Sequence, residues 1–99
     1  MPGDEMGRQH ITAALGGRAI APLSHAERIE REQVHDLIQA VVSCCNSLLS
    51  RDGGTRAAER LAFYDDEFRR RDAMSAFERA EVIRRYPDLL AELRAELDR

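Results

Sequence analysis

The sequence predicts an all-α fold: a small antiparallel helical bundle of three to four helices that follows an extended or weakly ordered N-terminal arm. Apolar residues recur at helical spacing in an uninterrupted segment from Ser24 to Asp52. Two Ser-x-x-Glu patterns, at 24–27 and 75–78, have the form of a capping box, which marks the start of a helix. A glycine pair at 53–54 separates the first helical segment from the second.

The first 23 residues differ in composition from the rest of the chain. The segment 1–7 is typical of a flexible terminus, and the glycine pair 16–17 divides two short apolar stretches. Alanines make the stretches poor strands, so a hairpin and a short helix ending at Gly16 both remain open. We therefore divide the chain into an arm, residues 1–23, and a helical domain, residues 24–99.

The first predicted helix begins after Ser24 and spans about 27 residues, or about 40 Å. Its apolar stripe consists of Val34, Leu37, Ile38, Val41, Val42, Cys45, Leu48 and Leu49. Adjacent positions on a helix point about 100° apart, so Cys44 and Cys45 are not placed to form a disulfide with each other. We expect both cysteines to be reduced and to serve as small apolar residues, with Cys45 at the centre of the stripe.

The second predicted helix begins with Thr55 as its N-cap and ends near Arg71. Its inner stripe is Ala57, Leu61, Tyr64 and Phe68. Its outer face carries three acid-first i,i+4 pairs, namely Asp65–Arg69, Asp66–Arg70 and Glu67–Arg71. These pairs indicate a solvated helix end.

The C-terminal part is predicted as a broken pair of helices. The third helix begins after Ser75, runs to about Arg85 and has Phe77, Ala80 and Ile83 on its inner line. Pro87 breaks or kinks the chain, because the residue before a proline avoids the α region. A last helix then places Leu89, Leu90, Leu93 and Leu97 on one face.

All fifteen basic side chains are arginine, and the chain contains no lysine. Lysine Schiff bases, lysine nucleophiles and phosphate-loop lysines are therefore excluded. We favour a compositional bias toward arginine as the explanation; the alternative is a functional demand for guanidinium groups, which suit carboxylate and phosphate partners. The net charge of −3 is finely distributed, which does not favour bulk attraction to DNA or membranes. Residues 1–7 contain no apolar core of a secretory signal, so we expect a cytoplasmic protein without a membrane segment.

Glu32 and His35 match Glu-x-x-His, the spacing with which one helix offers two ligands to a carboxylate-bridged metal pair. The chain holds one copy of this motif, so such a site requires a homodimer. The alternative is that both are ordinary surface residues beside the apolar stripe, and we favour that interpretation. No cofactor is predicted.

A nucleic-acid hypothesis rests on the segments 55–71 and 75–85, which have the lengths of a helix-turn-helix. Arg79, Arg84 and Arg85 would then face DNA. Glu78 and Glu81 lie among these arginines, so the basic face is not concentrated, and this remains the second alternative.

The favoured hypothesis is a non-enzymatic protein–protein interaction or regulatory module that acts through helical surfaces. Ile29, Phe63 and Val82 lie outside the predicted core stripes and are the interface candidates. The first helix is longer than the shorter helices can cover. We therefore expect an antiparallel homodimer that pairs the first helices, with another protein of unknown identity as a further partner.

Overall fold

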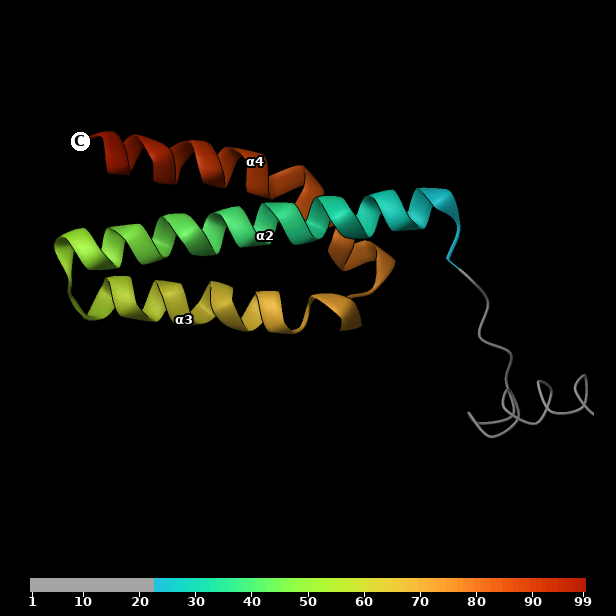
Figure 1. The fold of residues 1–99 in the computed structure, drawn as a ribbon, viewed down its shortest axis with the longest axis horizontal. Coiled ribbons are helices and arrows are strands. Elements are labelled where there is room, and N and C mark those ends of the chain that lie inside the picture. Colours follow the sequence, from blue (N-terminus) through green and yellow to red (C-terminus); the bar gives the residue numbers. More distant parts are fainter. Residues whose placement is uncertain (1–22) are drawn as a thin grey trace, which may run out of the picture.

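A computed structural model describes residues 23–99, which form three α-helices and a short 3₁₀ turn. The elements are α2 (His25–Asp52), α3 (Thr55–Arg69), η1 (Arg71–Ala73) and α4 (Ala76–Asp98). Figure 1 shows α3 and α4 on opposite sides of α2, with α3 running antiparallel to the other two. The predicted all-α bundle is confirmed. The predicted arm lies outside the described residues, except for Leu23.

Both predicted capping boxes are present. The Ser24 hydroxyl accepts from the Glu27 amide at 3.0 Å, and the Glu27 carboxylate accepts from the Ser24 amide at 3.1 Å. Ser75 and Glu78 repeat the arrangement at 3.1 and 2.8 Å. These bonds satisfy amide groups that a helix start otherwise leaves unpaired, and they fix where α2 and α4 begin.

Two glycines make the turn between α2 and α3. The Gly53 amide donates to the Leu49 carbonyl at 2.8 Å and ends α2. Gly53 and Gly54 have φ values of 69° and 97°, which side chains with a Cβ rarely adopt. The N-cap of α3 is Gly54 and not Thr55, so that prediction was wrong. The backbone geometry of the turn requires glycine at the position where a side-chain cap would otherwise stand.

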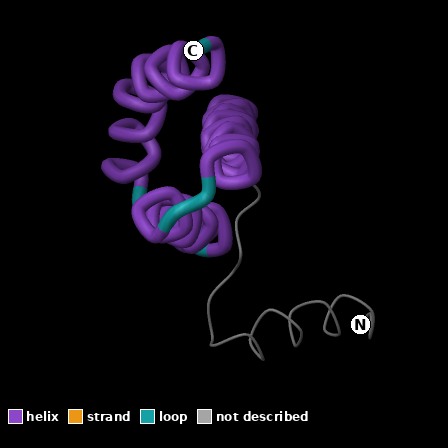
Figure 2. Tube along the Cα trace, turned by 90° about the vertical axis from the view of Figure 1, so that its left-hand side faces the viewer, coloured by secondary structure: helices purple, strands orange, loops and turns teal. Residues whose placement is uncertain are grey.

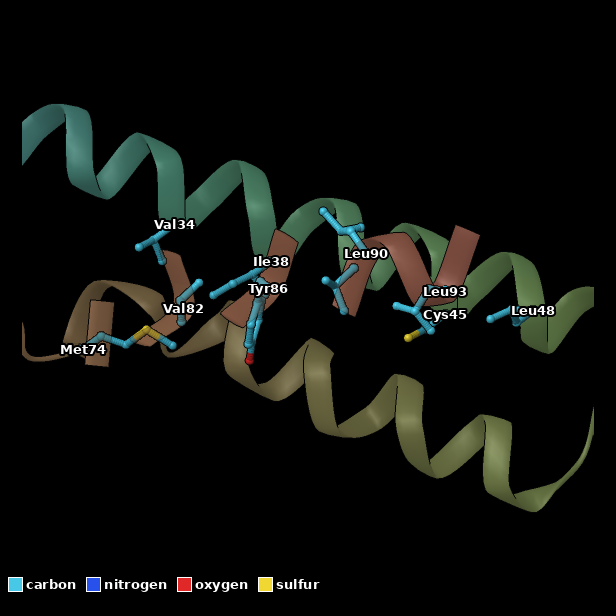
Figure 3. Close-up of a cluster of buried hydrophobic side chains, with 10 residues drawn as sticks. Val34, Ile38, Cys45, Leu48, Met74, Val82, Tyr86, Leu90 and Leu93 are labelled. Carbon is cyan, nitrogen blue, oxygen red and sulfur yellow. The ribbon is translucent and has the colours of Figure 1, made fainter. Parts of the chain in front are cut away.

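The hydrophobic core is built on α2 (Figure 3). Its fully buried side chains from α2 are Val34, Ile38, Val41, Cys45 and Leu48. The turn before α4 adds Met74, and α4 adds Val82, Tyr86, Leu90 and Leu93. No residue of α3 is fully buried, although its predicted stripe packs half-buried against this core. The predicted stripe of the first helix and the central position of Cys45 are confirmed.

The C-terminal segment is one continuous helix, so of the two predicted effects of Pro87, a break or a kink, the break was wrong. The proline is exposed, and its lack of an N–H removes one bond to the carbonyl one turn earlier without ending the helix. In Figure 1, α4 changes direction along its length.

The buried face of α4 agrees with the prediction in its second half, where Leu90 and Leu93 are buried and Leu89 and Leu97 pack against the core. It consists of Arg79, Val82, Tyr86, Leu90 and Leu93, while Phe77 is 73% exposed. Val82, expected outside the core, is 4% exposed and packs in the core cluster, so it is not available as an interface residue. The line predicted for the first half was wrong for Phe77 and Ala80, which are exposed, whereas Ile83 packs half-buried against the core.

The charged face of α3 agrees with the prediction in part. Arg69 pairs with Asp65 and Arg70 pairs with Asp66, each at 2.8 Å. The predicted Glu67–Arg71 pair is absent from the described ion pairs. Arg71 instead donates to the Phe68 carbonyl at 2.7 Å and lies over the Phe68 ring, 4.0 Å from its centroid.

α3 and α4 both pack on α2 but have no Cα atoms within 8 Å of each other. Viewed along the bundle, α3 and α4 stand apart with α2 to one side (Figure 2). Long side chains bridge the space: Arg60 meets Glu96 at 3.3 Å, and the Tyr86 hydroxyl donates to Glu67 at 2.9 Å. The separation of these two helices leaves a groove along one side of the bundle.

Between residues 23 and 99, no helix is both long enough and apolar enough to cross a membrane.

Gly53→Ala is expected to lower the free energy of unfolding by about 1–3 kcal/mol. A Cβ at this position meets no atom within 4 Å, so the cost comes from the backbone conformation alone. Thr55→Ala is the matched control: its hydroxyl makes no capping bond, and the change is expected to stay within about 0.5 kcal/mol. Urea unfolding followed by circular dichroism measures both, and equal values for the two variants would contradict the assignment of the turn.

Candidate functional site

The space between α3 and α4 contains two adjoining depressions, which together we call the interhelix groove. The larger has a volume of 540 Å³ and is lined by Phe63, Tyr64, Glu67, Arg84, Arg85, Tyr86, Asp88, Leu89 and Glu92. The smaller has a volume of 150 Å³ and is lined by Glu67, Met74, Phe77, Glu78, Glu81, Val82, Arg85 and Tyr86. The shared residues make the two depressions one continuous surface along α4.

Three aromatic rings lead from the core to the surface of the groove. Tyr86 of α4 is buried, and its ring meets the ring of Tyr64 edge-to-face with centroids 5.9 Å apart. Tyr64 in turn meets Phe63 edge-to-face at 4.9 Å. Such pairs are favourable beyond the area they bury. The outermost ring, Phe63, is held in place on one side and remains 58% exposed.

The two tyrosine hydroxyls of this cluster are kept neutral. Burial raises the pKa of Tyr64. Burial, together with the hydrogen bond to the Glu67 carboxylate, raises the pKa of Tyr86 well above its ordinary value. The neutral Tyr86 hydroxyl therefore donates a hydrogen bond to the Glu67 side chain. This bond ties α4 to α3 across the groove.

Charged groups on the groove fall into paired and unpaired sets. Arg84 pairs with Glu81 at 2.6 Å, and Glu67 accepts from Arg70 at 2.8 Å as well as from Tyr86. Arg85, Asp88 and Glu92 form no ion pair with any residue of 23–99. Their spacing along α4 places these three on neighbouring turns of one side of the helix.

The predicted nucleic-acid residues do not share one surface. Arg79 is 6% exposed; its guanidinium donates to Glu30 of α2 and, at 2.9 Å, to the Met74 carbonyl. It is therefore part of the core, where it joins the start of α2 to the turn before α4. Arg84 is paired with Glu81, which leaves Arg85 as the member of the set without a carboxylate partner in the described chain.

The two predicted metal ligands, Glu32 and His35, lie in the N-terminal half of α2. Glu32 is exposed, and the half-buried His35 packs its ring against Phe68 at 5.1 Å. Among residues 23–99, no three His, Cys, Asp or Glu side chains gather closely enough to hold a metal ion. A metal site at this pair would need ligands from outside the described part of one chain.

The structure separates the predicted interface residues. Ile29 is 44% exposed on the N-terminal part of α2, Phe63 is exposed on the groove, and Val82 is in the core. The apolar stripe of α2 is already covered by α3 and α4, so a dimer that pairs the first helices would depend on Ile29. Sequence reasoning missed Phe77, the most exposed large apolar residue among those described, because it was assigned to the inner line of its helix.

No protein-family model matches this chain, and neither a curated protein nor a solved structure shows significant similarity to it.

The two cysteines are expected to react at very different rates with iodoacetamide. Cys45 is 1% exposed, and burial raises the pKa of its thiol, whereas Cys44 is half-buried at the edge of the stripe. At neutral pH one thiol per folded chain should label, and Cys44→Ser should abolish that labelling until the chain is unfolded. Fast labelling of the Cys44→Ser variant, measured by mass spectrometry, would contradict the burial of Cys45.

Arg79→Ala is expected to lower the free energy of unfolding by about 2–3 kcal/mol, because Glu30 and the Met74 carbonyl lose a buried partner. Arg94→Ala is the matched control on the same helix: Arg94 is exposed and forms no described ion pair. Its effect should stay within about 0.5 kcal/mol. Denaturant titration compares the two, and an Arg79 variant as stable as the Arg94 variant would show that Arg79 is not a core residue.

Proposed function

We propose that this chain is a non-enzymatic protein-interaction module with a regulatory role, and that the interhelix groove is its binding surface. The observation that carries the proposal is Phe63, a large apolar ring at the edge of the groove that is 58% exposed and contacts Tyr64 edge-to-face. Aromatic side chains held rigidly at a surface are typical anchors of protein interfaces, because they bury a large area at a small cost in conformational entropy.

The composition of the groove supports a protein partner over a small molecule. Small-molecule sites are mostly apolar and carry few polar groups. Here three aromatic rings and Leu89 share one open surface with the charged groups Glu67, Arg84, Arg85, Asp88 and Glu92. Unpaired charges around an apolar centre fix the orientation of a partner and select against wrong ones.

The raised pKa of Tyr86 favours binding over acid–base catalysis in the groove. An efficient general acid or base has a pKa near the working pH. The pKa of Tyr86 is moved away from neutrality, chiefly by burial, and its hydroxyl is already bonded to Glu67. This pair therefore supports a structural bridge in the wall of a binding surface.

The proposal is tested by affinity purification of the tagged full chain from an extract of its source organism, with retained proteins identified by mass spectrometry. Phe63→Ser is expected to reduce retention of the specific partner by about tenfold, as the loss of an interface anchor does. Gln39→Ser is the matched control, because Gln39 is exposed on the polar face of α2, away from the groove. It should retain the partner fully.

Two outcomes would overturn this function. One is that no retained protein depends on Phe63. The other is that Gln39→Ser reduces retention as strongly as Phe63→Ser does. If the protein retained by the tagged chain is an untagged copy of the same chain, that copy is treated as the specific partner in this experiment.

A further inference from the structure

The interhelix groove carries the excess negative charge of the molecule. Its two depressions are lined by five carboxylates and two arginines, which gives the lining a net charge of −3. The whole chain has the same net charge of −3, so acidic and basic side chains balance each other outside the groove. A surface of one sign attracts a partner of the opposite sign and disfavours a partner of its own sign. The charge of the groove therefore favours a basic occupant.

Two of these carboxylates are not compensated by the chain itself. The lining arginine Arg84 is paired with Glu81 at 2.6 Å. Among the ion pairs of residues 23–99, none includes Asp88 or Glu92. Both are exposed, and they lie one turn apart on α4, where like charges repel each other. A cation bound beside them relieves that repulsion.

Apolar side chains accompany the two carboxylates. Leu89 lies between them in sequence, and it lines the same depression as Phe63 of α3, whose ring is 58% exposed. The aliphatic stem of an arginine or lysine packs on apolar surface while its charged end remains free to meet a carboxylate. A guanidinium group also stacks favourably on an aromatic ring. The larger depression therefore offers a basic side chain both kinds of contact.

We infer that the occupant of the interhelix groove is a basic, amphipathic segment of another protein. Its arginine or lysine side chains pair with Asp88 and Glu92, and its apolar side chains pack on Phe63 and Leu89. The groove follows α4 from Phe77 to Glu92, about 24 Å, which suits a partner helix of about four turns. This inference rests on the proposed function, because it needs the groove to be a binding surface, and it names the class of partner that binds there.

Fluorescence anisotropy of two labelled synthetic peptides, titrated with the full chain, tests the inference. Both peptides are amphipathic helices of about 16 residues with the same leucine face. One carries arginine at its polar positions, and the other carries glutamate. The arginine peptide is expected to bind at least about tenfold more tightly than the glutamate peptide, and its affinity should fall as the salt concentration rises.

The double variant D88N/E92Q should weaken binding of the arginine peptide by about tenfold, because it removes the two uncompensated carboxylates. The matched control is E32Q/D36N, which removes two exposed carboxylates at the same spacing from α2, outside the groove. It should change the affinity by no more than about twofold. Phe63→Ser should weaken binding by about tenfold, while the circular dichroism spectrum stays unchanged because the ring is largely exposed.

Arg85→Gln should act in the opposite direction. Arg85 lines both depressions and forms no ion pair with any residue of 23–99, so it repels a basic partner. Its removal should tighten binding of the arginine peptide by about threefold. Arg94→Gln removes an exposed arginine of the same helix that does not line the groove, and it should have a smaller effect.

Equal binding of the two peptides would overturn the inference, and so would equal effects of D88N/E92Q and E32Q/D36N. A dimer of the full chain that is lost in Phe63→Ser, measured by light scattering, would also overturn it, because a second copy would then occupy the groove. If the peptides bind equally but a protein retained in the affinity purification still depends on Phe63, the groove keeps its proposed function and the basic partner is rejected.

Discussion

The apolar stripe of α2 is the feature on which the rest of the structure depends. Its buried side chains between Val34 and Leu48 serve as the packing surface for both remaining helices. Burial of one such side chain contributes about 1.5–3 kcal/mol, so this stripe holds a large share of the stabilising free energy. Because α3 and α4 are both placed by α2, they need not touch each other. The groove between them is a consequence of that shared support.

Arg79 shows how a charged residue takes part in this core. Its planar guanidinium donates to the Glu30 carboxylate and to the Met74 carbonyl at once, so the buried charge is paired and hydrogen-bonded. Arg79 therefore joins the first turn of α4 to the start of α2 and to the turn before α4. Most other arginines with ion pairs lie on the surface, where each pair contributes little. Among the arginines of residues 23–99, Arg79 is the one that is buried and uses the fork geometry of its guanidinium in the interior.

Local signals were sufficient to predict most of the fold. The capping boxes at Ser24 and Ser75 and the stripe of α2 depend on neighbouring residues, and all are present in the structure. The leucine face in the second half of α4 was predicted, but the buried face of its first half was missed because Arg79 interrupts the apolar pattern with a charge. The groove was not predictable from local patterns, since the spacing of α3 and α4 depends on how each rests on α2. Phe63 was identified as lying outside its helix stripe, but the ring that supports it, Tyr64, and the opposing wall required the three-dimensional arrangement.

α2 and α4 form the core, and α3 packs on α2 without a fully buried residue of its own. Native-state hydrogen exchange, read amide by amide, tests this most directly, because it measures the free energy at which each helix opens. We expect amides of α2 between Val34 and Leu48 to open only with global unfolding, and amides of α3 to open at a lower free energy. Equal opening free energies for α3 and α2 would contradict it.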